Sequence, residues 1–279
     1  MNFLGIILAS IFGYLLGSVS FSIIVVQWRK GFDIRTTGSG NAGATNTTRV
    51  LGKFWGFIVA FLDGCKVIVT ALFAVGLSAI NLPLFSETSY FIPAFFVLIG
   101  HCWPIWYKFK GGKAVSTFLG LLFISNIFYF IFFMILWFSF AAYTRKVSIA
   151  SIIAGLSTGL FFIWLPWVSG INEFSYMWNS YDSWSLVWNG PDGEFMRFAW
   201  INYLHVPTSE LTGYYFADSL LEINLIIMIS LIILAYRHFP NIVRIKKRIE
   251  PQTFPKMTPE QKAEYRRYIH EPKKKKQKR

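Results

Sequence analysis

The sequence has 279 residues, of which 54% are hydrophobic, with a mean hydropathy of +0.46 and a formal net charge of +13. This composition excludes an ordinary soluble domain, because so apolar a chain must expose much of its surface to lipid. Its two cysteines lack CxxC spacing, which excludes a disulfide framework and a cysteine-bound metal, and we expect neither a metal nor a cofactor.

Seven apolar segments predict an all-α integral membrane protein in which seven transmembrane helices form a bundle. The first segment is nearly free of charge, and it lacks the basic start and the small-residue site of a cleaved signal peptide. The fourth has only 12 residues, too few to cross a ~30 Å hydrocarbon core, so a short or re-entrant helix is predicted there. The segments are 1–27, 54–79, 90–107, 114–125, 127–143, 149–168 and 219–236.

The basic residues predict the orientation of this bundle, because the cytoplasmic loops of membrane proteins are enriched in Lys and Arg. With the N-terminus outside and the C-terminus in the cytoplasm, four cytoplasmic segments hold 25 of the 27 Lys and Arg. Only Lys66, within the second apolar segment, and Arg197, on the outside, remain. The cytoplasmic segments are 27–53, 108–113, 144–148 and 237–279.

The chain divides into a membrane domain, 1–248, and a basic cytoplasmic tail, 249–279. Within the domain, 169–218 is predicted to be an external loop insertion whose tryptophans suit a membrane interface, with a small external binding module as the alternative. Because the tail directly follows an apolar helix, we expect it to lie on anionic headgroups of the membrane. No nucleic acid partner is expected, since no folded recognition motif accompanies the tail.

A run of glycine, hydroxyl and amide residues, Thr37–Arg49, lies between the first two apolar segments. Its glycines let backbone N–H groups converge, and the arginine adds a charge suited to bidentate phosphate contact. The run therefore predicts a cradle for an anion, and a flexible linker is the alternative. The residues that we expect to bind phosphate or substrate here are Gly38, Ser39, Gly40, Asn41, Gly43, Thr45, Asn46 and Arg49.

A second glycine-rich run, Lys108–Thr117, leads into the short fourth segment. Two glycines allow close approach to the backbone, and the first N–H groups of the helix that follows point toward a bound anion. Lys113 is predicted to contact phosphate, whereas the other two lysines of the run are equally explained as membrane anchors. The further candidates for phosphate or substrate binding here are Gly111, Gly112, Ser116 and Thr117.

Several polar residues stand alone in the sequence. His101 is a candidate for orienting substrate, although a structural hydrogen bond is the commoner role of a lone histidine. Asp63 and Lys66, three residues apart on one helix, are expected to form an ion pair. Ser148 is expected to cap the helix that follows it. The run Arg237–Arg244, taken alone, indicates a basic membrane anchor.

Eight motifs follow one another along the chain: GSVSF at 17–21, DIR at 33–35, GSGNAGATNTTRVLG at 38–52, LDGCK at 62–66, GHCWP at 100–104, FKGGKAVST at 109–117, SIASI at 148–152 and RHFPNIVR at 237–244. Together they resemble the bacterial glycerol-3-phosphate acyltransferases that use acyl phosphate, the PlsY family. The resemblance covers about 1–165 and 219–248. The external insertion and the basic tail depart from the compact family pattern.

The resemblance implies a multi-pass enzyme of the bacterial cell membrane with its active site on the cytoplasmic face. It implies transfer of an acyl group from acyl phosphate to the 1-hydroxyl of glycerol 3-phosphate, giving lysophosphatidate and phosphate, the first acylation step of phospholipid synthesis. The expected partners are these two substrates and membrane lipids. On this basis we predict catalytic roles for Ser39, Arg49, His101, Lys113 and Asn241, and substrate binding by Ser148 and His238 as well as by the two glycine-rich runs.

The sequence contains neither a GxSxG elbow nor an HxxxxD signature. We therefore expect direct attack by the substrate hydroxyl without a covalent acyl-enzyme, and a substrate phosphate oxygen that accepts the proton. The main alternative function is a membrane transporter for a phosphorylated solute or anion, which predicts polar residues at mid-membrane. A third possibility is a non-enzymatic anchor that recruits partners through its tail.

Overall fold

The computed structural model describes residues 3–85, 88–164, 220–253 and 258–270. Every regular element within these ranges is a helix. The α-helices are α1 (Leu4–Ser18), α2 (Phe21–Lys30), α3 (Ala44–Leu51), α4 (Lys53–Ser78), α5 (Phe91–Cys102), α6 (Val115–Ser125), α7 (Ile127–Thr144), α8 (Val147–Leu156), α12 (Leu220–Lys246) and α13 (Pro259–His270). Short helices of other types are η1 (Ile34–Thr36), η2 (Pro83–Phe85), η3 (Ile105–Tyr107) and the π-helical η4 (Ser157–Trp164), which continues α8.

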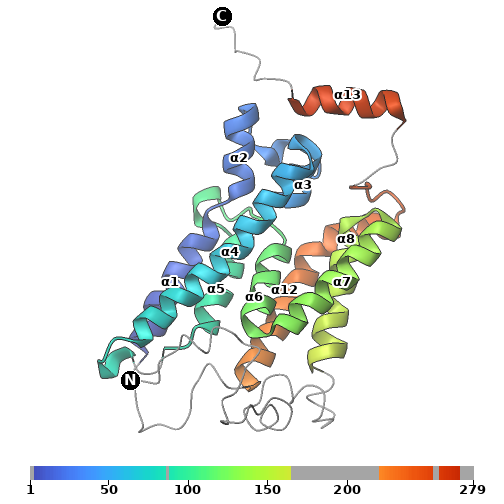
Figure 1. Ribbon diagram of the computed structural model, residues 1–279. Coiled ribbons are helices and arrows are strands. Elements are labelled where there is room, and N and C mark those ends of the chain that lie inside the picture. The colour runs from blue at the N-terminus through green and yellow to red at the C-terminus, as the bar shows by residue number, and fades with distance from the viewer. Residues whose placement is uncertain (1–2, 86–87, 165–219, 254–257, 271–279) are drawn as a thin grey trace, which may run out of the picture.

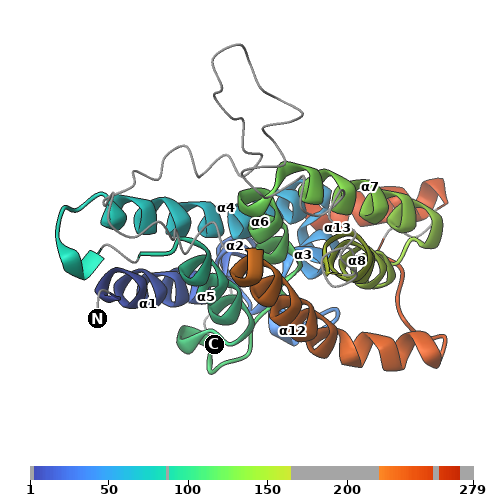
Figure 2. The ribbon, with the colours of Figure 1, turned by 90° about the horizontal axis from the view of Figure 1, so that it is seen from below.

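The helices form a bundle of two groups with α6 between them (Figure 1, Figure 2). One group contains α1, α4 and α5, and the other contains α7, α8 and α12. The central helix α6 contacts both α4 and α7, and its Phe118, Leu121 and Leu122 side chains are fully buried. A helix of 11 residues is stable here because longer helices enclose it. The short helix predicted near 114–125 is confirmed.

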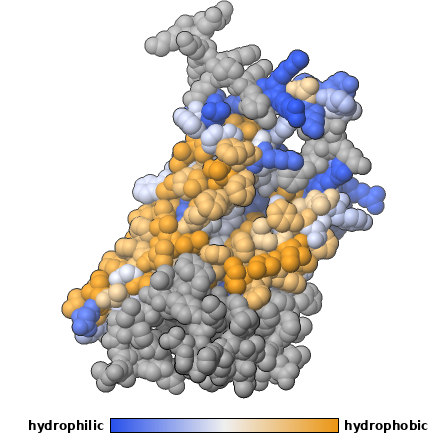
Figure 3. All heavy atoms as spheres, in the orientation of Figure 1, coloured by the Kyte–Doolittle hydropathy of each residue, from blue (hydrophilic) through white to orange (hydrophobic). Residues whose placement is uncertain are grey.

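Four helical segments are long and apolar enough to cross a membrane, and the first of them combines α1 and α2. Large apolar side chains such as Phe57, Phe61 and Ile135 are exposed on the sides of the bundle. Figure 3 shows a broad hydrophobic surface on the face of the bundle that is turned toward the viewer. A surface of this kind suits lipid rather than water. The four segments are Leu4–Lys30, Lys53–Ser78, Ile127–Thr144 and Leu225–Lys246.

The first predicted segment is not one continuous helix. Val19 and Ser20 are extended and separate α1 from α2. The buried Lys66 donates a hydrogen bond to the Val19 carbonyl, and its ammonium also pairs with Asp63 at 2.7 Å from Nζ to Oδ1. The predicted ion pair is therefore confirmed. Because an unpaired carbonyl is costly in an apolar interior, the bond from Lys66 explains how the break is tolerated.

The first glycine-rich run ends in the helix α3. The chain turns through Gly43 and then buries a face made of Thr47, Val50 and Leu51. Both valine and leucine belong to a small apolar cluster with α2 and α4. The helix forms because this buried face recurs at helical spacing.

The last apolar segment also extends further than predicted, since α12 continues past 236 to Lys246 with Pro240 inside it. The helical continuation places Arg237, Asn241 and Arg244 at intervals of four and three residues, on one face. This face turns toward the two glycine-rich runs. Taken alone this run indicated a membrane anchor, and the resemblance implied site roles for His238 and Asn241; in the structure it contacts the run that carries Lys113.

The predicted external insertion, 169–218, and the lysine-rich end, 271–279, lie outside the described residues. Of the tail, α13 is described, and Figure 1 shows it lying across the end of the bundle above α3. The Tyr265 hydroxyl of α13 donates a hydrogen bond of 2.8 Å to the Thr48 carbonyl of α3.

Candidate active site

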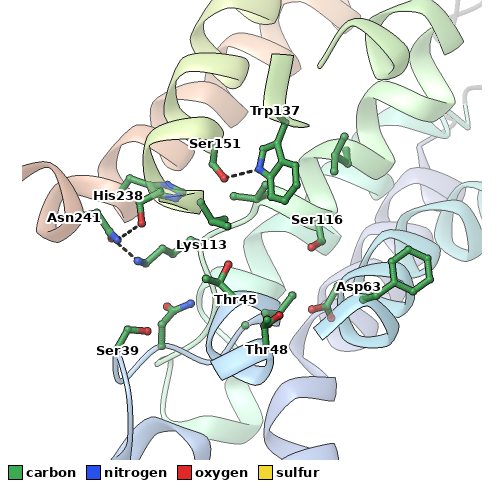
Figure 4. A pocket seen from close by; sticks show the side chains of 18 of the residues that line it. Ser39, Thr45, Thr48, Asp63, Lys113, Ser116, Trp137, Ser151, His238 and Asn241 are labelled. Carbon is green, nitrogen blue, oxygen red and sulfur yellow. Dashed lines mark hydrogen bonds between the residues drawn. The ribbon is translucent and has the colours of Figure 1, made fainter. Parts of the chain in front are cut away.

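A cavity of about 300 Å³ lies where α3 and α12 meet the starts of α6 and α8 (Figure 4). Its wall combines polar side chains from both glycine-rich runs with apolar side chains from α4, α6 and α7. A second cavity of about 310 Å³ adjoins it and shares three of its residues, Ser39, Asn41 and Lys113. The predicted site residues in these walls are Ser39, Gly40, Asn41, Gly43, Thr45, Arg49, His101, Lys113, Ser116, Ser148, His238 and Asn241.

The structure does not place five of the predicted residues in these walls. Thr117 is buried, and its hydroxyl donates to the Ala114 carbonyl within the start of α6. The other four shape the two runs rather than line a cavity. The five are Gly38, Asn46, Gly111, Gly112 and Thr117.

Asn46 organises the first glycine-rich run from beneath. Its buried side-chain carbonyl accepts a hydrogen bond of 3.1 Å from the Ser39 N–H. Its amide donates to three backbone carbonyls, those of Ile34, Thr37 and Asn41, at 3.0–3.1 Å. Gly38 packs against this amide with a φ of 61°, and a Cβ there would lie 2.2 Å from the Asn46 oxygen. Asn46 therefore shapes the run, with its hydrogen-bonding capacity already in use.

Replacing Asn46 by aspartate is expected to destabilise the protein by about 1–3 kcal/mol, since three carbonyls lose their donor. The substitution keeps the size of the side chain, so a packing defect does not account for the loss. Thermal unfolding in detergent measures the effect, and Asn41→Asp is the matched control because the side chain of Asn41 lies in the cavity wall. Equal melting temperatures for both variants would contradict this role.

Arg49 extends from α3 into the cavity wall. Its Nη2 donates to the Thr253 hydroxyl at 3.3 Å, while its buried Nε has no hydrogen-bond partner among the described residues. Burial lowers the pKa of the guanidinium, Arg244 lowers it further, and the carboxylate of Glu250 opposes both effects. An incompletely paired guanidinium in a cavity wall suits a bound anion.

The second glycine-rich run is fixed to the end of α5. The Gly112 N–H donates to the His101 carbonyl at 2.9 Å, and the Gly111 N–H donates to the Cys102 carbonyl at 3.2 Å. A Cβ on Gly112 would lie 2.0 Å from Nε2 of the His101 ring, so only glycine allows this contact. The imidazole thus supports the backbone that immediately precedes Lys113.

Lys113 lies at the junction of the two cavities. Its ammonium donates to the side-chain carbonyl of Asn241, and Figure 4 shows the two side chains approaching from the run before α6 and from α12. Burial lowers the pKa of Lys113 to about 8, Arg244, Arg49 and Arg237 lower it as well, and Glu250 raises it. A cation surrounded by other cations gains strongly from an added anion.

The amide of Asn241 connects Lys113 to a buried acidic group. It donates to Ser148 Oγ at 2.6 Å and to Glu250 Oε1 at 2.7 Å. Ser148 in turn donates to Glu250, and it makes no capping hydrogen bond, so the predicted capping role is wrong. Arg244 completes the network with a 2.7 Å bond from Nε to the second oxygen of Glu250.

Glu250 and Arg237 also belong to the site, although neither was among the predicted site residues. Glu250 falls just beyond the predicted domain boundary at 248. The one feature of the sequence that could have indicated it is that a single acidic residue directly follows a basic run. Arg237 donates to the carbonyls of Gly112 and Gly111 at 2.9 and 2.8 Å, and it also lines the second cavity. No sequence pattern distinguishes it from an anchor.

The two histidines of the site differ in their surroundings. His101 is buried, with Nδ1 3.7 Å from the Asp63 carboxylate, and both residues line the first cavity. His238 lies 2.8 Å from the Leu234 carbonyl through Nδ1. Since a carbonyl only accepts, Nδ1 carries the hydrogen in this contact.

The site gathers at least two cationic groups and several hydroxyl and amide groups at one end of an apolar bundle. The same cavity also has apolar lining residues, among them Phe57, Met134 and Trp137. Such residues suit a hydrocarbon chain, while the polar lining residues suit phosphate. Fold and site together define an integral membrane protein with a cavity that combines cationic, polar and apolar lining residues.

Comparisons with known proteins narrow this class. The family described as "Glycerol-3-phosphate acyltransferase" matches residues 7–188. The chain is 53% identical to the glycerol-3-phosphate acyltransferase of Mesoplasma florum, over 91% of this chain and 97% of the relative. It is 52% identical to that of Mycoplasma mycoides subsp. mycoides, over 92% and 96%. The chain therefore belongs to the glycerol-3-phosphate acyltransferase family, and it is a membrane acyltransferase of this family.

The fold agrees with this membership. The crystal structure of PlsY, an integral membrane glycerol 3-phosphate acyltransferase, in its glycerol 3-phosphate form is similar with a TM-score of 0.61 and 29% identity. The similarity covers 89% of this chain and 95% of that one. The resemblance drawn from the motifs is thus confirmed at the level of the family.

Proposed function

We propose that the protein transfers an acyl group from acyl phosphate to the 1-hydroxyl of glycerol 3-phosphate, giving lysophosphatidate and inorganic phosphate. The observation that carries this proposal is the convergence of Lys113 and Arg49, from two separate glycine-rich runs, on one cavity with an apolar wall. Both substrates contain phosphate and one contains an acyl chain, so their chemistry matches both kinds of lining residue. The relatives named above support the acceptor.

In this mechanism the substrate hydroxyl oxygen attacks the acyl carbon, and the bond from that carbon to the phosphate oxygen breaks. The hydroxyl proton passes to a substrate phosphate oxygen. Lys113 and Arg49 stabilise the negative charge that develops on the departing phosphate. Ser148 bonds to Asn241 and Glu250 rather than to a histidine, which favours direct attack over a covalent acyl-enzyme. Radiolabelled acyl group retained on denatured protein would contradict direct attack.

The proposed topology places the site on the cytoplasmic face, with seven membrane-spanning helices, the N-terminus outside and the basic tail on anionic headgroups. The distribution of basic residues supports it, because Arg49, Lys113 and Arg244 all lie at one end of the bundle. Labelling of single cysteines introduced at exposed positions of that end, from each side of sealed vesicles, tests the orientation.

The identity of the acyl donor is tested by supplying acyl phosphate, acyl-CoA and the acyl carrier protein thioester separately to purified protein. We expect product only from acyl phosphate, and release of phosphate only when glycerol 3-phosphate is present. Product formed from either thioester alone would overturn the proposed donor. Uptake of a phosphorylated solute into vesicles without product would favour the transporter.

The pKa of Lys113 leads to a pH prediction. Burial and nearby arginines lower that pKa to about 8, so the ammonium that contacts phosphate is lost as the pH rises through this value. We therefore expect kcat/KM to fall above about pH 8, because kcat/KM reports ionisations of the free enzyme. Lys113→Arg keeps the charge at all these pH values and is expected to remove the alkaline decline, even if its activity is lower.

A further inference from the structure

The backbone of the second glycine-rich run is strained. Three of its residues that carry a Cβ, Lys108, Phe109 and Ala114, have positive φ angles of 57°, 58° and 67°. This left-handed conformation is disfavoured for such residues, and it persists where surrounding contacts impose it. The run precedes α6 and carries Lys113, so the contacts that impose its shape also place the ammonium.

Two guanidinium groups hold three carbonyls of this run and the carbonyl of Tyr107, which immediately precedes it. Arg237 binds the carbonyls of the two glycines, as described above. Arg35 binds the other two: its Nη1 donates to the Tyr107 carbonyl at 2.8 Å and to the Lys110 carbonyl at 3.4 Å. The guanidinium of Arg35 also lies 5.7 Å from the centre of the Tyr107 ring.

Arg35 is itself fixed by its neighbour in the sequence. Its Nη2 lies 2.7 Å from Asp33 Oδ2, and its Nε contacts both oxygens of that carboxylate at 3.1 and 3.0 Å. Asp33 Oδ1 also accepts a hydrogen bond of 2.8 Å from the Arg35 backbone N–H, and Asp33 thereby caps the start of the short helix η1. The side-chain hydrogen bond between them lowers the pKa of Asp33 and raises that of Arg35. A forked guanidinium can hold a carboxylate and a carbonyl at once.

The helix η1 is continuous with the first glycine-rich run. The Asn46 amide donates to the carbonyls of Ile34 and Thr37, which flank Arg35, and its oxygen fixes the Ser39 N–H. Arg35 therefore joins the backbone that carries Ser39 and Arg49 to the backbone that carries Lys113. The two runs are otherwise separated in the sequence by the whole of α4 and α5.

Arg35 is absent from the walls of both cavities of the site. An effect of Arg35 on the chemistry must therefore act through the runs that it joins. We propose that Arg35 is a positioning residue for the acyl transfer proposed above, on which this inference rests: it holds the Lys113 run in register with the Arg49 run, so that the two phosphates are gripped at a fixed separation.

The test compares Arg35→Ala with Arg35→Lys and with a matched control, Arg29→Ala. Arg29 lies at the end of α2 against the Trp28 and Trp55 rings, and among the described residues no hydrogen bond joins its side chain to either run. We expect Arg35→Ala to lower kcat/KM about ten-fold, since displacements of ~1 Å at a site can cost up to about 100-fold. Arg35→Lys should recover part of this loss through one carbonyl contact, and Arg29→Ala should match the wild type.

Two further measurements distinguish positioning from a general loss of structure. A low, non-denaturing concentration of guanidinium ion should restore part of the activity of Arg35→Ala, because it can occupy the vacated position between the carbonyls, and should leave Arg29→Ala unchanged. Hydrogen exchange should accelerate at the Gly111 and Gly112 amides, whose bonds to Cys102 and His101 depend on the shape of the run. If Arg35→Ala does not accumulate in the membrane, Arg35→Gln replaces it in all three measurements.

Wild-type activity of Arg35→Ala would overturn the inference, and so would a loss of activity without guanidinium rescue and without faster exchange. A wild-type protein that is inactive with acyl phosphate and glycerol 3-phosphate would overturn the proposed function instead. In that case the exchange measurement still decides whether Arg35 holds the run, because it requires no activity.

Discussion

Replacing Lys113 by alanine is expected to lower kcat/KM for acyl transfer by about 10- to 150-fold, which corresponds to the loss of about 1.5–3 kcal/mol from one charged contact. Lys113 lies in the wall that the two cavities share, and its ammonium is already oriented by Asn241. Its removal also leaves the amide oxygen of Asn241 without its donor. Initial rates at varied acyl phosphate and varied glycerol 3-phosphate measure the effect.

Lys110→Ala is the matched control for this substitution. Lys110 lies on the same run and is exposed, and its backbone carbonyl, which Arg35 binds, is unchanged by the substitution. We expect a change of no more than about two-fold, because surface substitutions away from specific contacts shift free energies by at most about 0.5 kcal/mol. The amount of each variant in the membrane is measured in parallel, so that a fall in rate is not confused with poor insertion.

Arg49→Ala is expected to reduce kcat/KM to a similar extent, since Arg49 supplies the cation of the other run. The two effects should not simply add if both cations grip one phosphate, because each then depends on the position set by the other. Unchanged kinetics in both variants would contradict an anion site between the two runs.

The meeting of the two glycine-rich runs could be predicted from the sequence. Lysine and arginine were concentrated in the segments predicted to face the cytoplasm, and both runs belonged to such segments. Arg49 and Lys113 accordingly line one cavity. The length of the fourth apolar segment also predicted α6 correctly, because a helix of 11 residues cannot cross the bilayer unaided.

The roles of individual polar side chains could not be predicted, because their partners lie far away in the sequence. Ser148 at the start of a helix suggested a cap, yet it binds Glu250, 102 residues further on. The break after α1 contains no proline, and the Val19 carbonyl at the break accepts a hydrogen bond from Lys66, 47 residues away. Asparagine in a glycine-rich run suggested a binding residue, but the amide of Asn46 donates to backbone carbonyls of the run and of η1. Sequence spacing does not specify such directions.

Glu250 has the least predictable position of all, since it follows the predicted end of the membrane domain and precedes a basic tail. Glu250→Ala is expected to lower the free energy of unfolding by about 3 kcal/mol, near the lower end of the range for breaking a buried ion pair. The side chain of Glu250 is only 1% exposed and accepts hydrogen bonds from Ser148, Asn241 and Arg244. In the variant Ser148 and Arg244 lose this acceptor, and the amide of Asn241 keeps only its bond to Ser148.

The pH dependence of stability provides an independent measure of this carboxylate. Burial alone would raise the pKa of Glu250, but hydrogen bonds from Ser148, Arg244 and Asn241 together bring it below its ordinary value of 4.5. A pKa that is lower in the folded state contributes stability above the unfolded value and loses it as the pH falls through the folded value. We therefore expect the melting temperature of the wild type to decrease below about pH 4.5, and that of Glu250→Ala to decrease less.

Glu250→Gln and Glu260→Gln serve as comparisons for Glu250→Ala. Glutamine keeps one acceptor for Ser148 and Asn241 but loses the charge that pairs with Arg244, so an intermediate loss of stability is expected. Glu260 is exposed on α13, and its replacement should leave the melting temperature unchanged. If Glu250→Ala melted like the wild type at neutral pH while acyl transfer persisted, the network around Asn241 would not depend on the tail. A lower melting temperature for Glu250→Ala would show that the folded membrane domain extends beyond the predicted boundary at 248. It would then include part of the segment whose basic composition had suggested only contact with lipid.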